Sequence, residues 1–115
     1  MKNHKLKTLS GLPDTPYFAV IFTSQRTDED KSYAETADNM LELAVQQAGY
    51  LGVDSVRQKK TGITVSYWKD ENSIQQWKQQ MDHLQAQVGG RTCWYEEYTV
   101  RIAKVERNYS FVKGE

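Results

Sequence analysis

The sequence predicts an α+β fold of the ferredoxin-like kind, in which one antiparallel sheet carries two helices on one face in the order β-α-β-β-α-β. Three observations predict it. An almost continuously apolar run, YFAVIFTS, opens the folded part at residues 17–24. Two later segments repeat their apolar residues at the helical steps of three and four, and a β-rich segment follows each of them. A chain of 115 residues is the size of one domain, so we expect a single core.

The first strand and first helix follow an N-terminal arm. Residues 1–16 contain two prolines and no sustained periodicity, which indicates an arm, and we expect the domain to span residues 17–115. The run at 17–24 is typical of a strand covered on both faces. An acidic cluster at 28–30 favours a helix start, because negative charge stabilises the positive end of a helix. The predicted helix ends at Gly49, and its apolar residues are Tyr33, Ala37, Met40, Leu41, Ala44 and Ala48.

A hairpin and a second helix are predicted next. Residues 53–59 and 63–68 are the two strand candidates, joined by a turn at 60–62. Asp70 is a suitable N-cap for the helix that follows, and Gly89-Gly90 stops it. The apolar stripe of this helix consists of Ile74, Trp77, Met81, Leu84 and Val88.

The last predicted strand covers residues 95–107. Tyr98, Val100 and Ile102 alternate on one face, whereas Ala103 and Val105 continue on the other, so we predict a β-bulge near Ile102. The sheet face without helices would expose apolar side chains unless a second copy covered it. We therefore expect a homodimer.

Composition and motif content argue against several classes of function. Fifteen basic residues balance fifteen acidic ones, which argues against a nucleic-acid or membrane partner. Cys93 is the only cysteine, and no leader or membrane-length apolar run is present, so we expect a cytoplasmic protein. No phosphate loop, nucleotide motif or paired metal-ligand spacing occurs, and we predict no cofactor and no metal.

Several motifs resemble one known family. They are GITVSYWKDENSIQQW at 62–77, MDHL at 81–84, WYEEY at 94–98 and VERNY at 105–109. Together they resemble the antibiotic biosynthesis monooxygenase family. The resemblance implies a homodimer in which two sheets form an α/β barrel, with a pocket between each sheet and its helices. Members of that family are oxygenases that act on polycyclic aromatics without metal or flavin, haem-degrading enzymes, or proteins with no known activity, so the resemblance implies one of these three.

The haem-degrading branch matches incompletely. Trp77 corresponds to its helix tryptophan, but the iron-ligand position falls on Gln87, and strand one offers no asparagine. An amide is a poor iron ligand beside imidazole. Haem binding would require His83 to substitute, and it is the third hypothesis.

The candidate catalytic residues are His83 and Arg101. Imidazole titrates near neutral pH, so His83 could act as a base, although a packing role explains it as well. Arg101 could stabilise a developing oxyanion, with an exposed strand arginine as the alternative. Gln76, Gln80 and Gln87 form a polar stripe with His83 that could line a pocket or face water.

Flat aromatic substrates are held by aromatic side chains, so the candidate substrate-binding residues are Phe22, Tyr67, Trp68, Trp77 and, from the polar stripe, Gln87. Core packing alone would also explain Trp77. The leading hypothesis is a cofactor-independent monooxygenase that oxidises a small aromatic or polycyclic molecule. The alternative is a dimeric, non-enzymatic ligand-binding or stress-related module.

Overall fold

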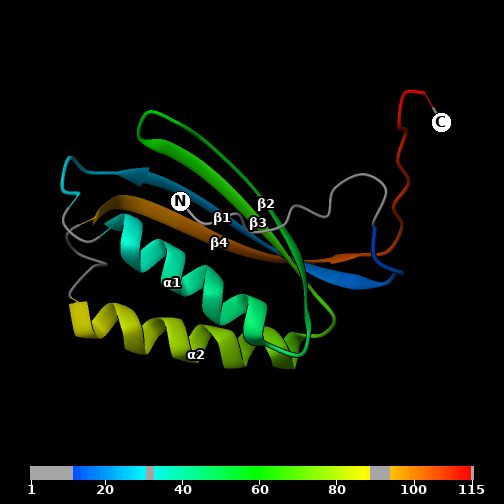
Figure 1. The fold of residues 1–115 in the computed structure, drawn as a ribbon, viewed down its shortest axis with the longest axis horizontal. Helices are drawn as coiled ribbons and strands as arrows, with labels where there is room; N and C mark the ends of the chain where they lie inside the picture. Colours follow the sequence, from blue (N-terminus) through cyan, green and yellow to red (C-terminus); the bar gives the residue numbers. More distant parts are fainter. Residues whose placement is uncertain (1–11, 31–32, 89–93, 115) are drawn as a thin grey trace.

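The computed structural model describes residues 12–30, 33–88 and 94–114, which form the six predicted elements in the predicted order (Figure 1). Their bounds are β1 Tyr17–Arg26, α1 Tyr33–Gln46, β2 Tyr50–Gln58, β3 Thr61–Trp68, α2 Glu71–Val88 and β4 Tyr95–Val105. The four strands form one antiparallel sheet in the order β2-β3-β1-β4. The ferredoxin-like prediction is confirmed, although α1 ends at Gln46 rather than Gly49 and β2 begins at Tyr50 rather than Val53.

The register of the sheet assigns each strand residue to one of two faces. Phe18 lies opposite Trp68, and Val20 lies opposite Ser66 on β3 and Ile102 on β4. Val20 and Trp68 belong to the buried core beneath the helices, so residues opposite them share that side. We call it the helix face, and we call the other side of the sheet the far face. Both helices lie on the helix face (Figure 1).

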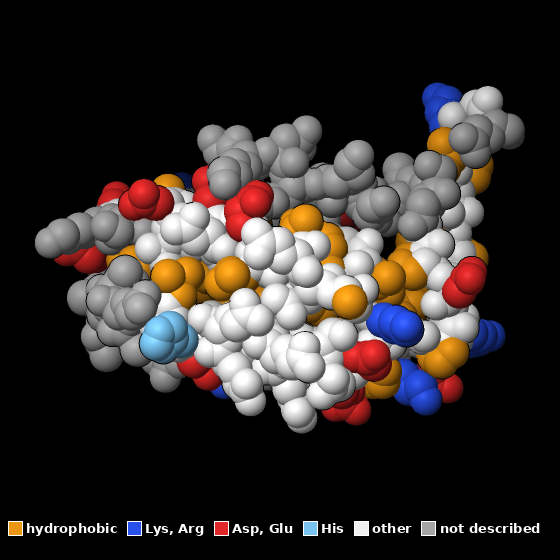
Figure 2. All heavy atoms as spheres, turned by 60° about the horizontal axis from the view of Figure 1, so that its bottom comes forward, with side chains coloured by type: hydrophobic (Ala, Val, Ile, Leu, Met, Phe, Trp, Pro, Cys, Tyr) orange, Lys and Arg blue, Asp and Glu red, His pale blue; other side chains and the backbone are white. Residues whose placement is uncertain are grey.

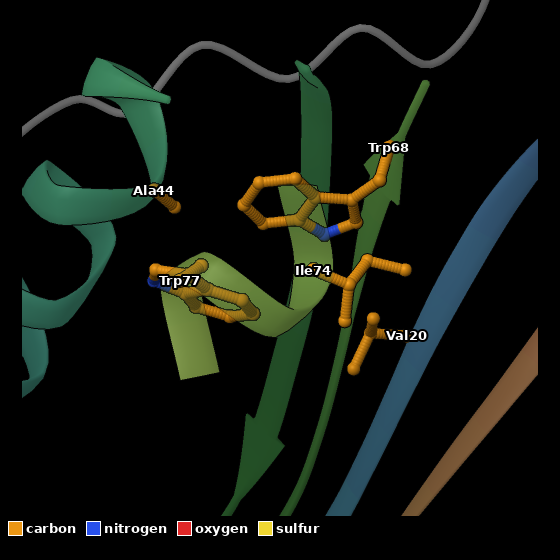
Figure 3. Close-up of a cluster of buried hydrophobic side chains, with 5 residues drawn as sticks. All are labelled: Val20, Ala44, Trp68, Ile74 and Trp77. Carbon is orange, nitrogen blue, oxygen red and sulfur yellow. The ribbon is translucent and has the colours of Figure 1, made fainter. Parts of the chain in front are cut away.

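Two stacked indoles form the centre of the core. Trp68 from β3 and Trp77 from α2 are both buried, and their ring centroids are 4.8 Å apart (Figure 3). Each indole N–H has a partner: Trp68 Nε1 donates to Ser66 Oγ at 2.8 Å, and Trp77 Nε1 donates to the Met40 carbonyl of α1 at 3.0 Å. A buried N–H without an acceptor would destabilise the fold. The pair therefore joins the sheet to both helices.

The chain geometry at the hairpin turn and at two neighbouring positions explains why Gly49 and Gly62 carry no side chain. Lys59 has a φ of 57°, which places the β2–β3 turn at Lys59 and Lys60, one residue earlier than predicted. A Cβ on Gly49 would overlap the Ser73 side chain, because the chain before β2 passes close to α2. A Cβ on Gly62 would meet the Arg57 guanidinium, which lies across β3 at that point.

The predicted bulge near Ile102 is wrong. Pairing between β1 and β4 runs without interruption from Tyr17 opposite Val105 to Gln25 opposite Glu97. The register shifts only beyond Gln25, where Arg26 pairs with Tyr95. The change of parity in the sequence arises because β4 carries apolar residues on both of its faces, not because a residue is inserted.

The N-cap of α2 has a testable pH dependence. Asp70 Oδ1 accepts the Ser73 backbone N–H at 2.8 Å, and this bond lowers the pKa of Asp70 below its ordinary 3.8. A lowered folded-state pKa stabilises the fold above the unfolded pKa, and the stabilisation is lost as the pH falls through the folded value. Asp70→Asn keeps an acceptor that does not titrate. We expect the stability difference between wild type and Asp70→Asn, from urea unfolding, to change between about pH 5 and about pH 3. A difference independent of pH would contradict this assignment.

Candidate functional site

The helices leave much of the helix face of β4 exposed. The buried core cluster between helices and sheet contains Val20 of β1 and Trp68 of β3, and none of its described members comes from β4. Three apolar residues of β4 point to the helix face but remain exposed: Tyr98 by 36%, Val100 by 47% and Ile102 by 51%. We call these three residues the β4 strip. The strip continues the apolar core out to the edge of the sheet and forms a surface on which a flat molecule can lie.

An aromatic cluster adjoins one end of the β4 strip. Phe22 of β1 lies 5.3 Å from Tyr98 and 5.6 Å from Tyr95, measured between ring centroids. Tyr33, the first residue of α1, packs edge-on against Tyr95 at 6.1 Å and against the buried Trp94 at 5.4 Å. With Arg26 these side chains form the aromatic–arginine cluster, defined as Phe22, Arg26, Tyr33, Trp94, Tyr95 and Tyr98. It joins the end of β1, the start of α1 and the start of β4.

Arg26 supplies a buried positive charge to this cluster. Its guanidinium lies 3.4 Å from the centroid of the Tyr33 ring, and its Nη2 donates to the Glu29 carbonyl at 2.7 Å and to Asp30 Oδ1 at 3.1 Å. The residue is nine-tenths buried, and its Nε has no hydrogen-bond acceptor within the part of the chain that the structure describes. The Asp30 carboxylate is exposed, so water screens its pairing with Arg26. The guanidinium therefore keeps a buried N–H donor that no described group accepts.

A second cation and a protonated hydroxyl lie at the same end of the sheet. Arg57 of β2 donates from Nη2 to the buried Ser24 Oγ at 3.2 Å. Burial raises the pKa of the Tyr95 hydroxyl, and the neighbouring Tyr33 raises it further, whereas Arg57 and Arg26 act in the opposite direction. The net effect is a raised pKa, so Tyr95 remains a neutral O–H group, and this hydroxyl is hydrogen-bonded to Tyr33.

The arrangement combines an apolar surface with a polar end. Val100 and Ile102 offer an apolar floor, Phe22 and Tyr98 offer aromatic rings, and Arg26 and Tyr95 can both donate hydrogen bonds. Buried charges and preorganised donors stabilise an oxyanion more strongly than water does, because they need not reorient. The site is therefore suited to a flat molecule that develops negative charge on an oxygen at one end.

The predicted site residues do not gather in one place. Phe22 lies in the aromatic–arginine cluster, but Trp68 and Trp77 lie in the core, where each packs against protein. Tyr67 points to the far face, where its hydroxyl donates to Asp54 Oδ2 at 2.7 Å and the edge of its ring meets Tyr17. Arg101 lies opposite Ile21, so it also points to the far face, and it is exposed. The location of Arg101 is that of an exposed strand arginine.

His83 lies on a different surface from the cluster. It is an exposed residue of α2 beside a hollow of about 400 Å³ that Leu43 of α1 also lines, together with Gln79, Gln80 and Leu84. Figure 2 shows this side of the molecule, where hydrophobic side chains are exposed among polar ones. Gln76 and Gln80 are exposed, as expected for a stripe that faces water. The side chain of Gln87 lies outside the described residues.

Sequence reasoning missed most of the cluster. Arg26, Tyr33, Trp94, Tyr95 and Tyr98 were not assigned to a pocket, although WYEEY was part of the family motif. One signal existed for Arg26: it lies at the same parity as Phe22, four residues along an apolar strand, which puts it on the same face. No pattern showed that Tyr33 would meet Trp94, because many residues separate them in sequence.

Two wider features bear on the class of protein. No helix in the described ranges is long and apolar enough to cross a membrane. Within residues 12–30, 33–88 and 94–114, no group of three or more His, Cys, Asp or Glu side chains is arranged to hold a metal ion.

Comparison with known proteins gives one family. A family model described as antibiotic biosynthesis monooxygenase matches residues 16–88. The uncharacterised protein YqjZ of Bacillus subtilis is 48% identical over 104 residues, which cover 90% of this chain and 91% of that protein. Jasmonate monooxygenase ABM of Pyricularia oryzae is 28% identical over 94 residues, which cover 76% of this chain but only 43% of that enzyme.

Solved structures agree with the fold. SnoaB of Streptomyces nogalater, a cofactor-independent oxygenase, superposes with a TM-score of 0.65 at 8% identity over 80% of this chain and 95% of that chain. PA3566 of Pseudomonas aeruginosa superposes with a TM-score of 0.60 at 14% identity over 82% and 96% of the two chains. At sequence identities this low, the superpositions show a shared fold and nothing about activity.

The raised pKa of Tyr95 can be tested by ultraviolet titration of tyrosinate in the folded protein. Burial also raises the pKa values of Tyr50 and Tyr67. We expect Tyr95→Phe to remove absorbance from the part of the curve above pH 10, the ordinary tyrosine pKa, and to leave the earlier part unchanged. Tyr67→Phe should remove a similar late part. A loss from the early part in Tyr95→Phe would show that the cluster does not keep this hydroxyl protonated.

Proposed function

The chain belongs to the antibiotic biosynthesis monooxygenase family, and we propose that it is a cofactor-independent monooxygenase that oxidises a small, flat aromatic molecule on the helix face of β4. One observation carries the proposal: the exposed β4 strip leads directly into a cluster that contains a buried guanidinium with an unpaired Nε among the described residues. An apolar surface alone would bind many kinds of molecule. An apolar surface that ends at the fixed Arg26 guanidinium favours a molecule that can become an anion.

The cluster would act on the oxygen of the substrate. A flat phenol that loses its hydroxyl proton to water becomes a phenolate, and an anthrone that loses a ring CH₂ proton to water becomes an enolate; either anion is electron-rich enough to reduce O₂. Arg26 and Tyr95 would donate hydrogen bonds to the resulting oxyanion, and so lower the free energy of the ionised form. Phe22 and Tyr98 would hold the ring plane beside the β4 strip, which restricts the orientation in which oxygen meets the carbanionic carbon.

The overall reaction balances without an added reductant. For an anthrone, the ring CH₂ loses two hydrogens, one oxygen atom of O₂ becomes the new carbonyl oxygen, and the other leaves as water. The substrate supplies all four electrons that O₂ takes up. The protein has to bind, ionise and orient the substrate, which are tasks that hydrogen bonds and aromatic contacts can perform.

A non-enzymatic binding module remains the alternative, and the location of His83 bears on it. His83, the candidate base, lies on the hollow between α1 and α2 rather than in the aromatic–arginine cluster. If the protein only binds ligands, His83→Ala should leave ligand binding unchanged and no substrate should increase oxygen uptake. If His83 is the base, the same substitution should lower the rate without weakening binding.

The proposal predicts a specific loss of oxygen uptake. With anthrone as the probe, Arg26→Met should lower kcat/KM for oxygen consumption by about a hundredfold, the usual effect of removing one oxyanion donor. Arg107→Met is the matched control, because Arg107 is exposed and lies beyond the end of β4. Circular dichroism would check that each variant is folded.

Two outcomes would contradict the proposal. Equal rates of oxygen uptake in wild type and Arg26→Met would show that Arg26 has no role in the reaction. The absence of oxygen uptake above the uncatalysed rate, with anthrone and with a set of polycyclic phenols, would favour the binding module.

A further inference from the structure

The Arg26 guanidinium already carries a carboxylate of its own chain. Asp30 Oδ1 accepts a hydrogen bond from Arg26 Nη2 at 3.1 Å, and the same nitrogen donates to the Glu29 carbonyl at 2.7 Å. The guanidinium also lies over the Tyr33 ring, 3.4 Å from its centroid. An anion that approaches Arg26 therefore meets a group of like charge that is bonded to the same cation.

The backbone of the loop between β1 and α1 holds this carboxylate in place. The Thr27 N–H donates to the Trp94 carbonyl at 2.8 Å, and the Glu29 N–H donates to Thr27 Oγ1 at 3.1 Å. The Asp30 carbonyl accepts the N–H of Tyr33, the first residue of α1, at 3.0 Å. The loop is thus tied to β4 at one end and to α1 at the other, and it presents the Asp30 side chain to Arg26.

The two partners of this ion pair differ greatly in exposure. The side chain of Arg26 is 11% exposed, whereas that of Asp30 is 85% exposed. A cation that is mostly buried is unfavourable without an anion beside it. A solvated carboxylate, in contrast, loses little when it releases its partner, because water replaces the contact. Asp30 therefore has the properties of an exchangeable counterion, which compensates Arg26 in the empty site and gives way to a ligand oxygen.

We propose that Asp30 is a specificity-determining residue of the oxygenase, an inference that rests on the proposed function. Its carboxylate disfavours aromatic acids and favours phenols that are neutral when they bind. An aromatic acid is charged at neutral pH, so it competes with Asp30 for Arg26 as soon as it enters, and like charges placed together weaken binding. A phenol ionises only near pH 10, as tyrosine does, so it enters without this competition. The substrate class is thus narrowed to uncharged phenols and their keto forms.

A neighbouring carboxylate provides the matched control. Asp28 belongs to the same loop, and its side chain is also highly exposed. It forms its ion pair with Lys60 of the β2–β3 turn instead, and this pair lowers the pKa of Asp28. Asp28→Asn and Asp30→Asn therefore change the net charge of the loop equally, but only the second removes the charge that is bonded to Arg26.

Two ligands of similar shape test the proposal. The dissociation constants of 2-naphthoate and 2-naphthol would be measured by isothermal titration calorimetry at about pH 7, where the first is charged and the second is neutral. We expect Asp30→Asn to bind 2-naphthoate about fivefold more tightly than wild type does, the effect of one exposed charge pair. Its dissociation constant for 2-naphthol should change by less than about twofold, because a neutral ligand does not compete with the carboxylate. Asn keeps an oxygen that accepts from Arg26 Nη2, so the guanidinium stays in place.

The control variant and the salt dependence complete the test. Asp28→Asn should change neither dissociation constant by more than about twofold, and the gain in Asp30→Asn should shrink in about 1 M sodium chloride, because salt screens charges near the surface. An unchanged affinity of Asp30→Asn for 2-naphthoate, or an equal gain in both variants, would overturn the role of Asp30 while 2-naphthol still binds. Failure of 2-naphthol to bind wild type would reject the proposed function, and this inference with it.

Discussion

The stacking of Trp68 on Trp77 is the contact on which the rest of the structure depends. One indole belongs to β3 and the other to α2, and the N–H of Trp77 reaches the Met40 carbonyl of α1, so three elements meet in one buried group. Large aromatic side chains contribute most of the burial in a core of this size. Because both N–H groups have acceptors, the pair provides this burial without an unsatisfied polar atom.

The position of the indole pair also accounts for the candidate site. It fixes both helices against β3 and the neighbouring β1, and the β4 strip on the same face stays exposed. At one end of that strip Tyr33, the first residue of α1, packs on Trp94 and Tyr95. These aromatic rings and the Arg26 guanidinium form the end of the surface. The same off-centre packing that stabilises the core therefore creates a surface for a ligand.

Local patterns in the sequence predicted the fold, but only part of the candidate site. The steps of three and four through Ile74, Trp77 and Met81 identified α2, because helical burial repeats within one segment. Arg26, Tyr33 and Trp94 come together only through the sheet register and the entry of α1, which no local pattern contains. The bulge near Ile102 was predicted wrongly because apolar residues on both faces of β4 imitate a slip in alternation. His83, Tyr67 and Arg101 were chosen for their chemistry, and they lie on other surfaces.

The most direct test of the central claim is to locate a bound ligand. Isotope-labelled protein would be titrated with naphthol, a flat phenol, while backbone amide chemical shifts are followed by NMR. The account predicts that the largest changes occur at Tyr95, Tyr98 and Val100 on β4 and at Phe22 and Arg26 on β1. Changes centred instead on Leu43 and His83 in the hollow between the helices, or on Tyr67 and Arg101 on the far face, would contradict it.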